Sequence, residues 1–295
     1  MALVTLKEIL ADARKKHYAI PAFDVSNYEM IKAVIDVCEE ERSPAIFMLL
    51  KADLEGRAQK MLIDLIKSAA ETATVPVCIH LDHATSYDDI VSFIEAGGSS
   101  VMYDGSKFSL EENIANTRRV VEFAHAHGVT VEAELGHVTD AIGGLSETGD
   151  VAEDEPAIED CLTQPDQVVR FVKETEVDCL AVAIGTAHGV YVSTPKLHFD
   201  RLNEIEAVSA CPLVLHGGSG TPDPDVQKAI SLGITKINIF SEVLASMNNG
   251  LKEKLNSIEN MSSWPVIVFG EARELMRATI RNKIRTFGSN GRIEA

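Results

Sequence analysis

The sequence predicts an α/β protein built as one eight-stranded (β/α)8 TIM barrel. Short apolar, β-branched runs alternate with longer amphipathic segments along the whole chain, and eight such runs can be counted. Strictly alternating strands and helices imply parallel strands joined by right-handed crossovers, and eight such units close naturally into a barrel. A doubly wound open sheet shows the same alternation and is the alternative fold.

The predicted elements follow one another without a linker that would mark a second domain. The candidate strands cover residues 18–23, 45–50, 77–81, 99–103, 130–135, 179–184, 213–216 and 236–240. Helical patterns lie between them, for example at 28–41, 57–71, 111–127, 166–175 and 223–232, with Asn27 and Ser109 as candidate N-caps. Because α/β barrels run to roughly 250 residues as one domain, we expect residues 1–295 to form a single domain.

Length and charge exclude several classes of protein. No apolar run approaches the roughly 18 residues of a membrane span. The first residues read as an amphipathic helix and not as a signal peptide, so we expect a cytoplasmic protein. A net charge of −18 disfavours nucleic acid and anionic membranes as partners. A phosphorylated small molecule would need local anion-binding devices such as backbone N–H groups, helix N-termini or a cation.

Cysteine usage is uninformative about chemistry, because the five cysteines are scattered and form no CxxC motif. We therefore expect neither a disulfide framework nor a cysteine-based zinc site.

One segment, about 137–164, interrupts the alternation. It lacks an apolar period and contains Gly143, Gly144 and a run of acidic residues. A loop of this length inside a compact barrel is typically an active-site lid or a partly disordered segment.

Polar residues gather where the predicted strands end, which is where TIM barrels build their active sites. His83, His188 and His216 would converge from three strands, and three imidazoles that leave one position open form a catalytic zinc site. A single histidine at a strand end is more often structural, but three at one face, beside Asp82 and Glu134, favour a metal centre.

The other histidines are predicted to have different places. His80 lies two residues before Asp82 on the same strand face, so it would support the site from behind. His137 follows a turn and is left unassigned. The remaining four are expected at the surface: His17, His125, His127 and His198.

A glycine-rich turn, residues 217–220, directly follows the seventh candidate strand and precedes a helix that begins near Asp223. Its free N–H groups suit a phosphate, as do the loops after strands seven and eight of many TIM barrels. Ser241, at the start of the last barrel helix, could add a hydroxyl to the same site.

Seven motifs carry a resemblance to a known family. They are YAIPAF at 18–23, VCIHLDH at 77–83, VEAELG at 131–136, GTAHG at 185–189, HGGSG at 216–220, KINI at 236–239 and FGS at 287–289. In this order and spacing, the chain resembles the class II (zinc-dependent) fructose- and tagatose-bisphosphate aldolases over nearly its whole length.

The resemblance implies a ligand set and a substrate. Zinc would be held by His83, His188 and His216, with Glu134 near the metal as an alternative ligand. A dihydroxyacetone-phosphate half-substrate would have its phosphate held near Gly189 and Gly217, with Ser219 and Ser241, and its hydroxyls contacted by Asn238. Members of the family often hold a monovalent cation near that phosphate, and they are typically homodimers or homotetramers.

The implied reaction is aldol cleavage of a ketose phosphate. Zinc would act as a Lewis acid at the C2 carbonyl, so no Schiff-base lysine is needed, and Asp82 is the candidate acid/base for the C4 hydroxyl proton. The family's second base is a glutamate on the loop after strand five, behind a Gly-Gly pair. Glu147 is our candidate, although this loop departs from the family pattern in length and wording.

Two departures concern the distal end of the substrate. Where bisphosphate-specific members carry Asp-Pro-Arg, this chain has Trp264-Pro265-Val266, and after the second strand a usual serine is replaced by Leu50-Lys51. An apolar side chain cannot replace a guanidinium at a phosphate. We therefore expect inefficient use of fructose 1,6-bisphosphate, with Lys51 or a nearby arginine meeting another polar group.

Two other readings stay open from the residues alone. Three histidines with Asp82 and Glu134 would also suit a metal-dependent TIM-barrel hydrolase. A non-catalytic, aldolase-like partner subunit is the second, although such a subunit has no need of a complete metal site.

Overall fold

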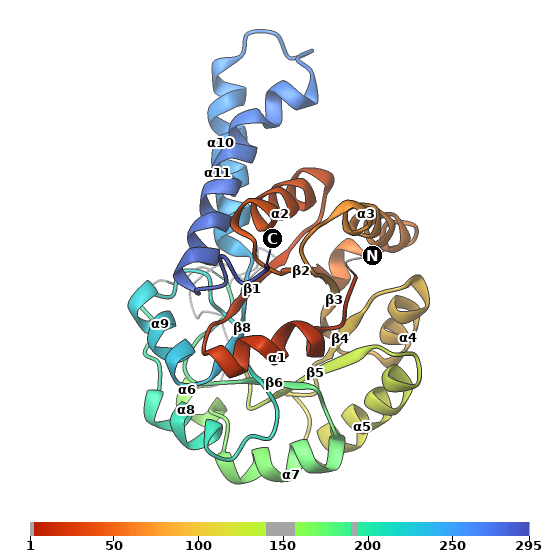
Figure 1. The fold of residues 1–295 in the computed structure, drawn as a ribbon, viewed down its shortest axis with the longest axis vertical. Helices are drawn as coiled ribbons and strands as arrows, with labels where there is room; N and C mark the ends of the chain where they lie inside the picture. The colour runs from red at the N-terminus through yellow and green to blue at the C-terminus, as the bar shows by residue number, and fades with distance from the viewer. Residues whose placement is uncertain (1–2, 140–156, 190, 192–193, 295) are drawn as a thin grey trace.

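The computed structural model describes residues 3–139, 157–189, 191 and 194–294, and it confirms the predicted (β/α)8 TIM barrel (Figure 1). All eight strands are parallel to their neighbours and close in chain order, β1 pairing with β8, which excludes the open sheet. The strands are β1 Ile20–Asp24, β2 Ala45–Leu50, β3 Val77–Ala84, β4 Ser100–Tyr103, β5 Thr130–Leu135, β6 Cys179–Val182, β7 Leu213–Leu215 and β8 Ile234–Ile239.

Helices surround the barrel and close its N-terminal end. They are α1 Leu6–Lys16, α2 Tyr28–Glu41, η1 Lys51–Asp53 (a 3-10 turn), α3 Ala58–Thr72, α4 Tyr87–Ala96, α5 Leu110–Ala126, α6 Ile158–Cys161, α7 Pro165–Thr175, α8 Phe199–Glu206, α9 Asp223–Ser231, α10 Ser241–Ser257 and α11 Pro265–Thr286. The predicted caps are confirmed: Asn27 accepts a hydrogen bond from Met30 N at 3.0 Å, and Ser109 forms a capping box with Glu112.

Two apolar cores hold this arrangement together. The larger lies between the strands and the surrounding helices, and the smaller fills the barrel interior and continues into the buried face of α1. Along β3 the inward-facing residues are Cys78, His80 and Asp82, which alternate because successive side chains of a strand point to opposite faces. The interior therefore changes from apolar at the end covered by α1 to polar at the opposite end, where the strands have their C-termini. This end is called the mouth of the barrel below.

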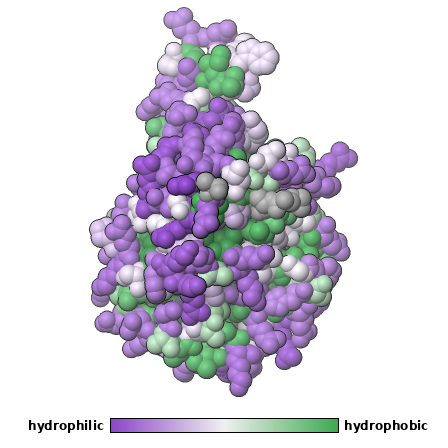
Figure 2. Space-filling view, viewed as in Figure 1, coloured by the Kyte–Doolittle hydropathy of each residue, from purple (hydrophilic) through white to green (hydrophobic). Residues whose placement is uncertain are grey.

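Helices α10 and α11 pack against each other and extend away from the barrel (Figure 1). Their base is fixed to α2 by ion pairs, among them Arg277 with Asp36 and Arg281 with Glu40. At the far end of these helices apolar side chains are exposed to solvent (Figure 2). Trp264 and Met261 are both 74% exposed, and Val266 and Ile267 are exposed as well.

The described parts of the segment expected as a loop at 137–164, residues 137–139 and 157–164, contact the barrel. His137 N donates to Cys161 O at 2.9 Å, Thr163 N donates to Ala183 O at 3.0 Å, and the short helix α6 lies within the expected loop. All five cysteines are free and buried. Across the described residues, no helix has the length and apolar character needed to cross a membrane.

Candidate active site and metal centre

The structure brings His83, His188 and His216 together at the C-terminal mouth, with ligand atoms that lie within 4.8 Å of one another. His83 Nε2 and His216 Nδ1 are 2.8 Å apart, and the His83 and His188 rings meet edge to face at 4.7 Å. His188 Nε2 is buried and has no hydrogen-bond partner among the described residues. Three ring nitrogens thus face one another around a point where a small cation fits.

His83 reaches this point through an irregularity of β3. Regular alternation would turn His83 outward, because Asp82 faces the interior. Instead the pairing of β3 with β4 shifts between Leu81 and Ala84, and His83 adopts a left-handed φ of 46°. Such a backbone is strained for a residue with a side chain. Because of this irregular backbone, the consecutive polar residues Asp82 and His83 both face the mouth of the barrel.

His188 and His216 are brought side by side by a close approach of two loops. A Cβ on Gly217 would lie 2.3 Å from Ala187 O, so only glycine allows the loop after β7 to pack on the loop after β6. Tyr191 ties the same loops, because its hydroxyl accepts from Ala187 N and donates to Gly217 O, both at 2.9 Å.

The electrostatic environment suits metal coordination by imidazole. Burial and the neighbouring His83 hold the pKa values of His188 and His216 well below their usual range, so both rings are neutral. Burial also opposes protonation of His83, but the carboxylates of Asp82, Asp104 and Glu134 outweigh it and raise its pKa to about 10. Neutral imidazole is the form that binds metal, so a metal must displace the His83 proton.

Asp82 lies beside the histidines, 3% exposed, and faces Asn238 across the cavity. Asn238 Nδ2 lies 3.2 Å from Asp82 Oδ1 and 3.3 Å from Oδ2, so its amide N–H groups face the carboxylate. This arrangement holds a carboxylate next to the point on which the histidines converge.

Glu134 lies on the other side of His83 from that point. With His83 and Asp104 it forms a second group whose ligand atoms lie within 4.8 Å of one another. His83 Nδ1 lies 3.1 Å from Asp104 Oδ2, and Val138 N donates to Glu134 Oε1 at 2.9 Å. Burial raises the pKa of Glu134 to about 8. Glu134 is therefore near the metal candidates but outside the three-histidine group.

The candidate phosphate-binding residues lie on the same side of the mouth. Gly189, Gly217 and Ser219 line the cavity with Asp82 and Asn238. Ser219 Oγ accepts from Phe240 N at 3.1 Å and so joins the loops after β7 and β8, and Ser241 is the first residue of α10, as expected.

Glu242 of α10 already contacts the glycine-rich turn. It accepts from Gly220 N at 2.6 Å and forms an ion pair with Lys283 at 2.7 Å. One N–H group of the turn is therefore bound to a carboxylate, and those of Gly217, Gly218 and Ser219 are the better candidates for a phosphate.

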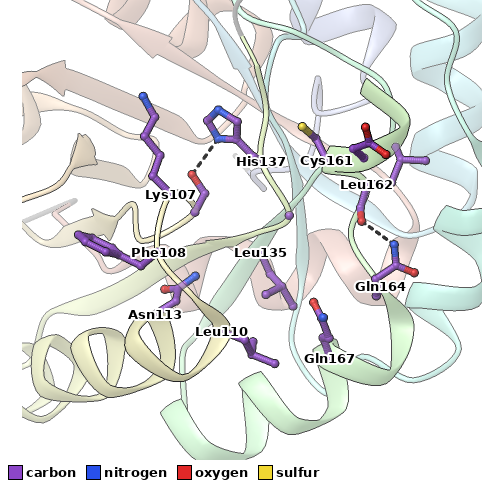
Figure 3. Close-up of a pocket in the computed structure, with 13 residues that line it drawn as sticks. Lys107, Phe108, Leu110, Asn113, Leu135, His137, Cys161, Leu162, Gln164 and Gln167 are labelled. Carbon is purple, nitrogen blue, oxygen red and sulfur yellow. Dashed lines mark hydrogen bonds between the residues drawn. The ribbon is translucent and has the colours of Figure 1, made fainter. Parts of the chain in front are cut away.

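The cavity at the histidines is small, with a volume of about 10 Å³, which is room for one water or ion. A larger pocket of about 640 Å³ lies between the β4–α5 turn and α6–α7 (Figure 3). It touches the mouth through His137, whose Nδ1 lies 2.9 Å from Ser106 Oγ and 3.9 Å from Glu134 Oε1. The residues that line the smaller cavity make it the candidate site, although the other cavity is larger.

Several predicted residues lie elsewhere. Glu147 falls outside the described residues. Trp264 and Val266 begin α11 at the far end of the projecting helices and do not line the cavity of their own chain. Lys51 is 60% exposed and forms an ion pair with Asp89.

Sequence reasoning missed other residues at the mouth. Asp104 follows β4 and contacts His83, and Asp24 ends β1 and lines the cavity. Both carry the same signal as Asp82, an acidic residue at the carboxyl end of a strand.

Comparisons with known proteins identify the family of the chain. The family profile described as "Fructose-bisphosphate aldolase class-II" matches residues 4–292. A fructose-bisphosphate aldolase of Geobacillus stearothermophilus is 39% identical over 300 residues, which cover 99% of both chains. The crystal structure of the YdjI aldolase from Escherichia coli K12 is 37% identical, with a TM-score of 0.85 over 99% of this chain and 100% of that one. A fructose-bisphosphate aldolase of Campylobacter jejuni, 22% identical, shares the fold with a TM-score of 0.79 over 98% of this chain and 96% of its own.

Proposed function

The chain belongs to the class II fructose-bisphosphate aldolase family and is an aldolase, and we propose that it reversibly cleaves a ketose 1-phosphate or ketose 1,6-bisphosphate to dihydroxyacetone phosphate and an aldehyde. The observation that carries the proposal is the group of three converging histidines beside Asp82. The hydrolase alternative is disfavoured, because aldolases match the full chain. The partner-subunit alternative is disfavoured, because the three histidines and Asp82 are all present.

We propose that one zinc ion per chain is held by His83, His188 and His216. The fit rests on the unpartnered His188 Nε2 and on the 2.8 Å approach of His83 Nε2 to His216 Nδ1. When bound, the metal supplies Lewis-acid stabilisation of the negative charge that develops at the C2 carbonyl oxygen. Cobalt and other divalent ions suit the same nitrogen donors, so affinity and availability decide which ion is used.

Asp82 is proposed to move the proton of the bond-breaking step. In cleavage its carboxylate accepts the C4 hydroxyl proton, and in condensation it returns that proton to the aldehyde oxygen. The Asn238 amide keeps the carboxylate oriented and can also contact a substrate hydroxyl. Glu147 remains our proposed second base, which exchanges a proton with the carbon released when the bond breaks.

The phosphate of the shared half-substrate is proposed to bind at Gly189, Gly217 and Ser219, with Ser241 and the N-terminus of α10. Backbone N–H groups and a helix N-terminus attract an anion locally, despite the net charge of −18. A monovalent cation beside the phosphate would offset the remaining repulsion.

The distal end of the substrate is proposed to lack a tight phosphate site. Trp264 and Val266 do not line the cavity of their own chain and carry no cation that they could offer to a neighbouring copy, and the charge of Lys51 is partly balanced by Asp89. Bisphosphates should therefore be cleaved less efficiently than ketose 1-phosphates.

We propose that the enzyme is a homodimer or homotetramer in which the exposed end of the α10–α11 projection contacts a second copy. Several large apolar side chains, including Trp264 and Met261, are exposed there, and such patches mark interfaces. Analytical ultracentrifugation of the 32.0 kDa chain should give at least twice that mass, and a monomer would contradict the proposal.

The test of function is a coupled assay for dihydroxyacetone phosphate release, run with and without a chelator. The substrate panel contains fructose and tagatose 1,6-bisphosphates and ketose 1-phosphates without the distal phosphate. Chelator-sensitive cleavage that is faster for the monophosphates is expected. Fast bisphosphate cleavage would overturn the distal-site proposal, and no release from any substrate would overturn the reaction itself.

A further inference from the structure

A buried ion pair lies inside the barrel, directly beneath the candidate metal centre. Glu132 of β5 and Lys236 of β8 are both 0% exposed, and Lys236 Nζ lies 3.0 Å from Glu132 Oε2. TIM-barrel interiors are usually filled by branched apolar residues, and taking two charges out of water carries a large desolvation cost. The contacts that this ion pair makes with residues of the metal centre can therefore explain why two charged residues are buried there.

Glu132 contacts the candidate metal ligand His216. His216 Nε2 lies 2.9 Å from Glu132 Oε1, while His216 Nδ1 faces His83 Nε2. An ionised carboxylate only accepts hydrogen bonds, so Nε2 must carry the ring proton and donate it. In the neutral ring Nδ1 then keeps its lone pair, which points toward the metal cavity. Glu132 thus selects the tautomer that can bind a metal through Nδ1.

Lys236 contacts the amide that faces the candidate acid/base. Its ammonium donates to Asn238 Oδ1 at 2.7 Å. An ammonium cannot accept a hydrogen bond, so the oxygen of Asn238 must face Lys236 and its nitrogen must face Asp82. The same contact excludes the flipped amide, which would turn the Asn238 oxygen toward the Asp82 carboxylate.

We propose that Glu132 and Lys236 act as one positioning unit for the active site. The pair fixes His216 as an Nδ1 metal ligand and fixes Asn238 with its N–H groups on Asp82, so the metal centre and the proton-transfer group share one buried support. This inference rests on the proposed function, but its metal-binding half can be tested without measuring activity. Both residues are fully buried and do not line the cavity, so in this proposal they act through His216 and Asn238.

Two double variants distinguish a positioning role of the pair from a role in packing alone. Removing one charge alone would leave its partner buried and uncompensated, whereas replacing both by apolar groups is often tolerated. Glu132→Leu with Lys236→Met removes the acceptor of the His216 proton. Glu132→Gln with Lys236→Met keeps a carbonyl oxygen in its place without the charge. The two proteins therefore differ only in the side chain at position 132, whose shortest contact besides Lys236 is with His216 Nε2; Cys179 Sγ and His80 Nε2 lie farther away, at 3.6 and 3.7 Å.

The first measurement is zinc affinity by competition with a chromophoric chelator. Loss of an outer hydrogen bond to a metal-binding histidine typically lowers metal affinity by about 10- to 100-fold. We expect that loss in the Leu/Met variant and recovery of most of the affinity in the Gln/Met variant. Asp178→Asn, which removes a buried carboxylate at the opposite end of the barrel, should bind zinc like the wild type. Equal affinity in all four proteins, or an equal loss in Asp178→Asn, would overturn the metal half of the proposal.

The second measurement is kcat at saturating zinc. Both paired variants lack the Lys236 donor, so Asn238 can rotate and Asp82 loses its fixed position. Misplacement of a catalytic group by about 1 Å can cost about 10²-fold, so we expect kcat to fall by at least about tenfold in both variants while KM changes little. A wild-type kcat in either double variant would overturn the proposal that Lys236 positions Asn238. If the wild type binds zinc but cleaves no ketose phosphate, the proposed reaction fails while the zinc result still decides the role of Glu132.

Discussion

The two ends of the barrel differ in how many hydrogen-bond partners their buried polar side chains have. At the end covered by α1, Asp178 accepts from Val131 N at 2.9 Å, forms an ion pair with Lys7 at 3.1 Å and lies 2.8 Å from His125 Nε2. At the mouth, His188 Nε2 and Glu134 Oε2 are buried and have no hydrogen-bond partner among the described residues. Glu206 Oε2, near α1, has none either, but the other oxygen of that carboxylate is paired with Arg14 at 3.2 Å.

The difference separates stability from function within one fold. A buried polar atom without a partner costs about 1–3 kcal/mol, so such atoms persist where another molecule supplies the missing contact. The left-handed backbone of His83, also at the mouth, costs additional free energy that a regular strand end would avoid. Substitutions at the mouth should therefore impair catalysis, and substitutions at the α1 end should impair stability.

The largest effect is expected for His188→Ala. This change removes one of three proposed zinc ligands, and with it Lewis-acid stabilisation that is worth several kcal/mol, or about 10³- to 10⁵-fold in rate. The coupled assay with excess zinc measures the loss, and zinc content of the purified protein should fall in parallel. His127→Ala, at an exposed histidine, is the matched control and should keep full activity. An active, zinc-replete His188→Ala enzyme would show that this buried nitrogen serves another purpose.

Asp82→Asn should follow in size. The amide has nearly the shape of the carboxylate but cannot accept the C4 hydroxyl proton, and loss of a general base costs about 10²- to 10⁴-fold. Zinc should remain bound, because no proposed ligand changes, so kcat should fall without loss of metal. A kcat within about threefold of the wild type would exclude Asp82 as the acid/base.

A third, smaller effect is a pH dependence of zinc affinity. The pKa of His83 is raised to about 10 in the metal-free protein, despite burial, by the carboxylates of Asp82, Asp104 and Glu134. Below that pH a proton must leave His83 before zinc binds, so affinity should rise with pH by about tenfold per unit between about pH 7 and 9. Chelator competition at each pH, corrected for protonation of the chelator, measures the slope.

The matched variant for this prediction is Asp104→Asn. It removes a carboxylate that raises the His83 pKa, so the affinity should stop rising at a lower pH than in the wild type. A zinc affinity independent of pH in both proteins would mean that His83 is not protonated before the metal binds.

Much of the mouth was predictable because its signals are local in the sequence. Alternating strands and helices give the barrel, and polar residues at strand ends give Asp82, His83, His188, His216 and Asn238 as candidates without coordinates. Asp104 carries the same signal, but a single acidic residue before a glycine is also typical of a turn, so the sequence alone does not mark it as a site residue.

Other features depend on tertiary geometry that the sequence does not encode locally. Alternation predicts His83 outward, and only the shifted pairing with β4 shows how it turns inward. Inward-facing positions of Glu132 and Lys236 follow from the strand period, but their contact across the barrel requires the closed strand order. An amphipathic pattern shows that α10 and α11 have an apolar face, not that they pack on each other away from the barrel.

The smallest effect on activity is expected at the α1 end, for Asp178→Asn. The change keeps the size of the side chain but weakens its contacts with Val131 N, Lys7 and His125. Loss of a charged hydrogen-bond acceptor at a buried site costs about 1–3 kcal/mol, so the free energy of unfolding in urea should fall by that amount while kcat and zinc affinity stay at wild-type values. His188→Ala should show the reverse pattern, with zinc binding lost and less change in the stability of the metal-free protein. A fall in kcat for Asp178→Asn without a fall in stability would mean that the two ends of the barrel are coupled.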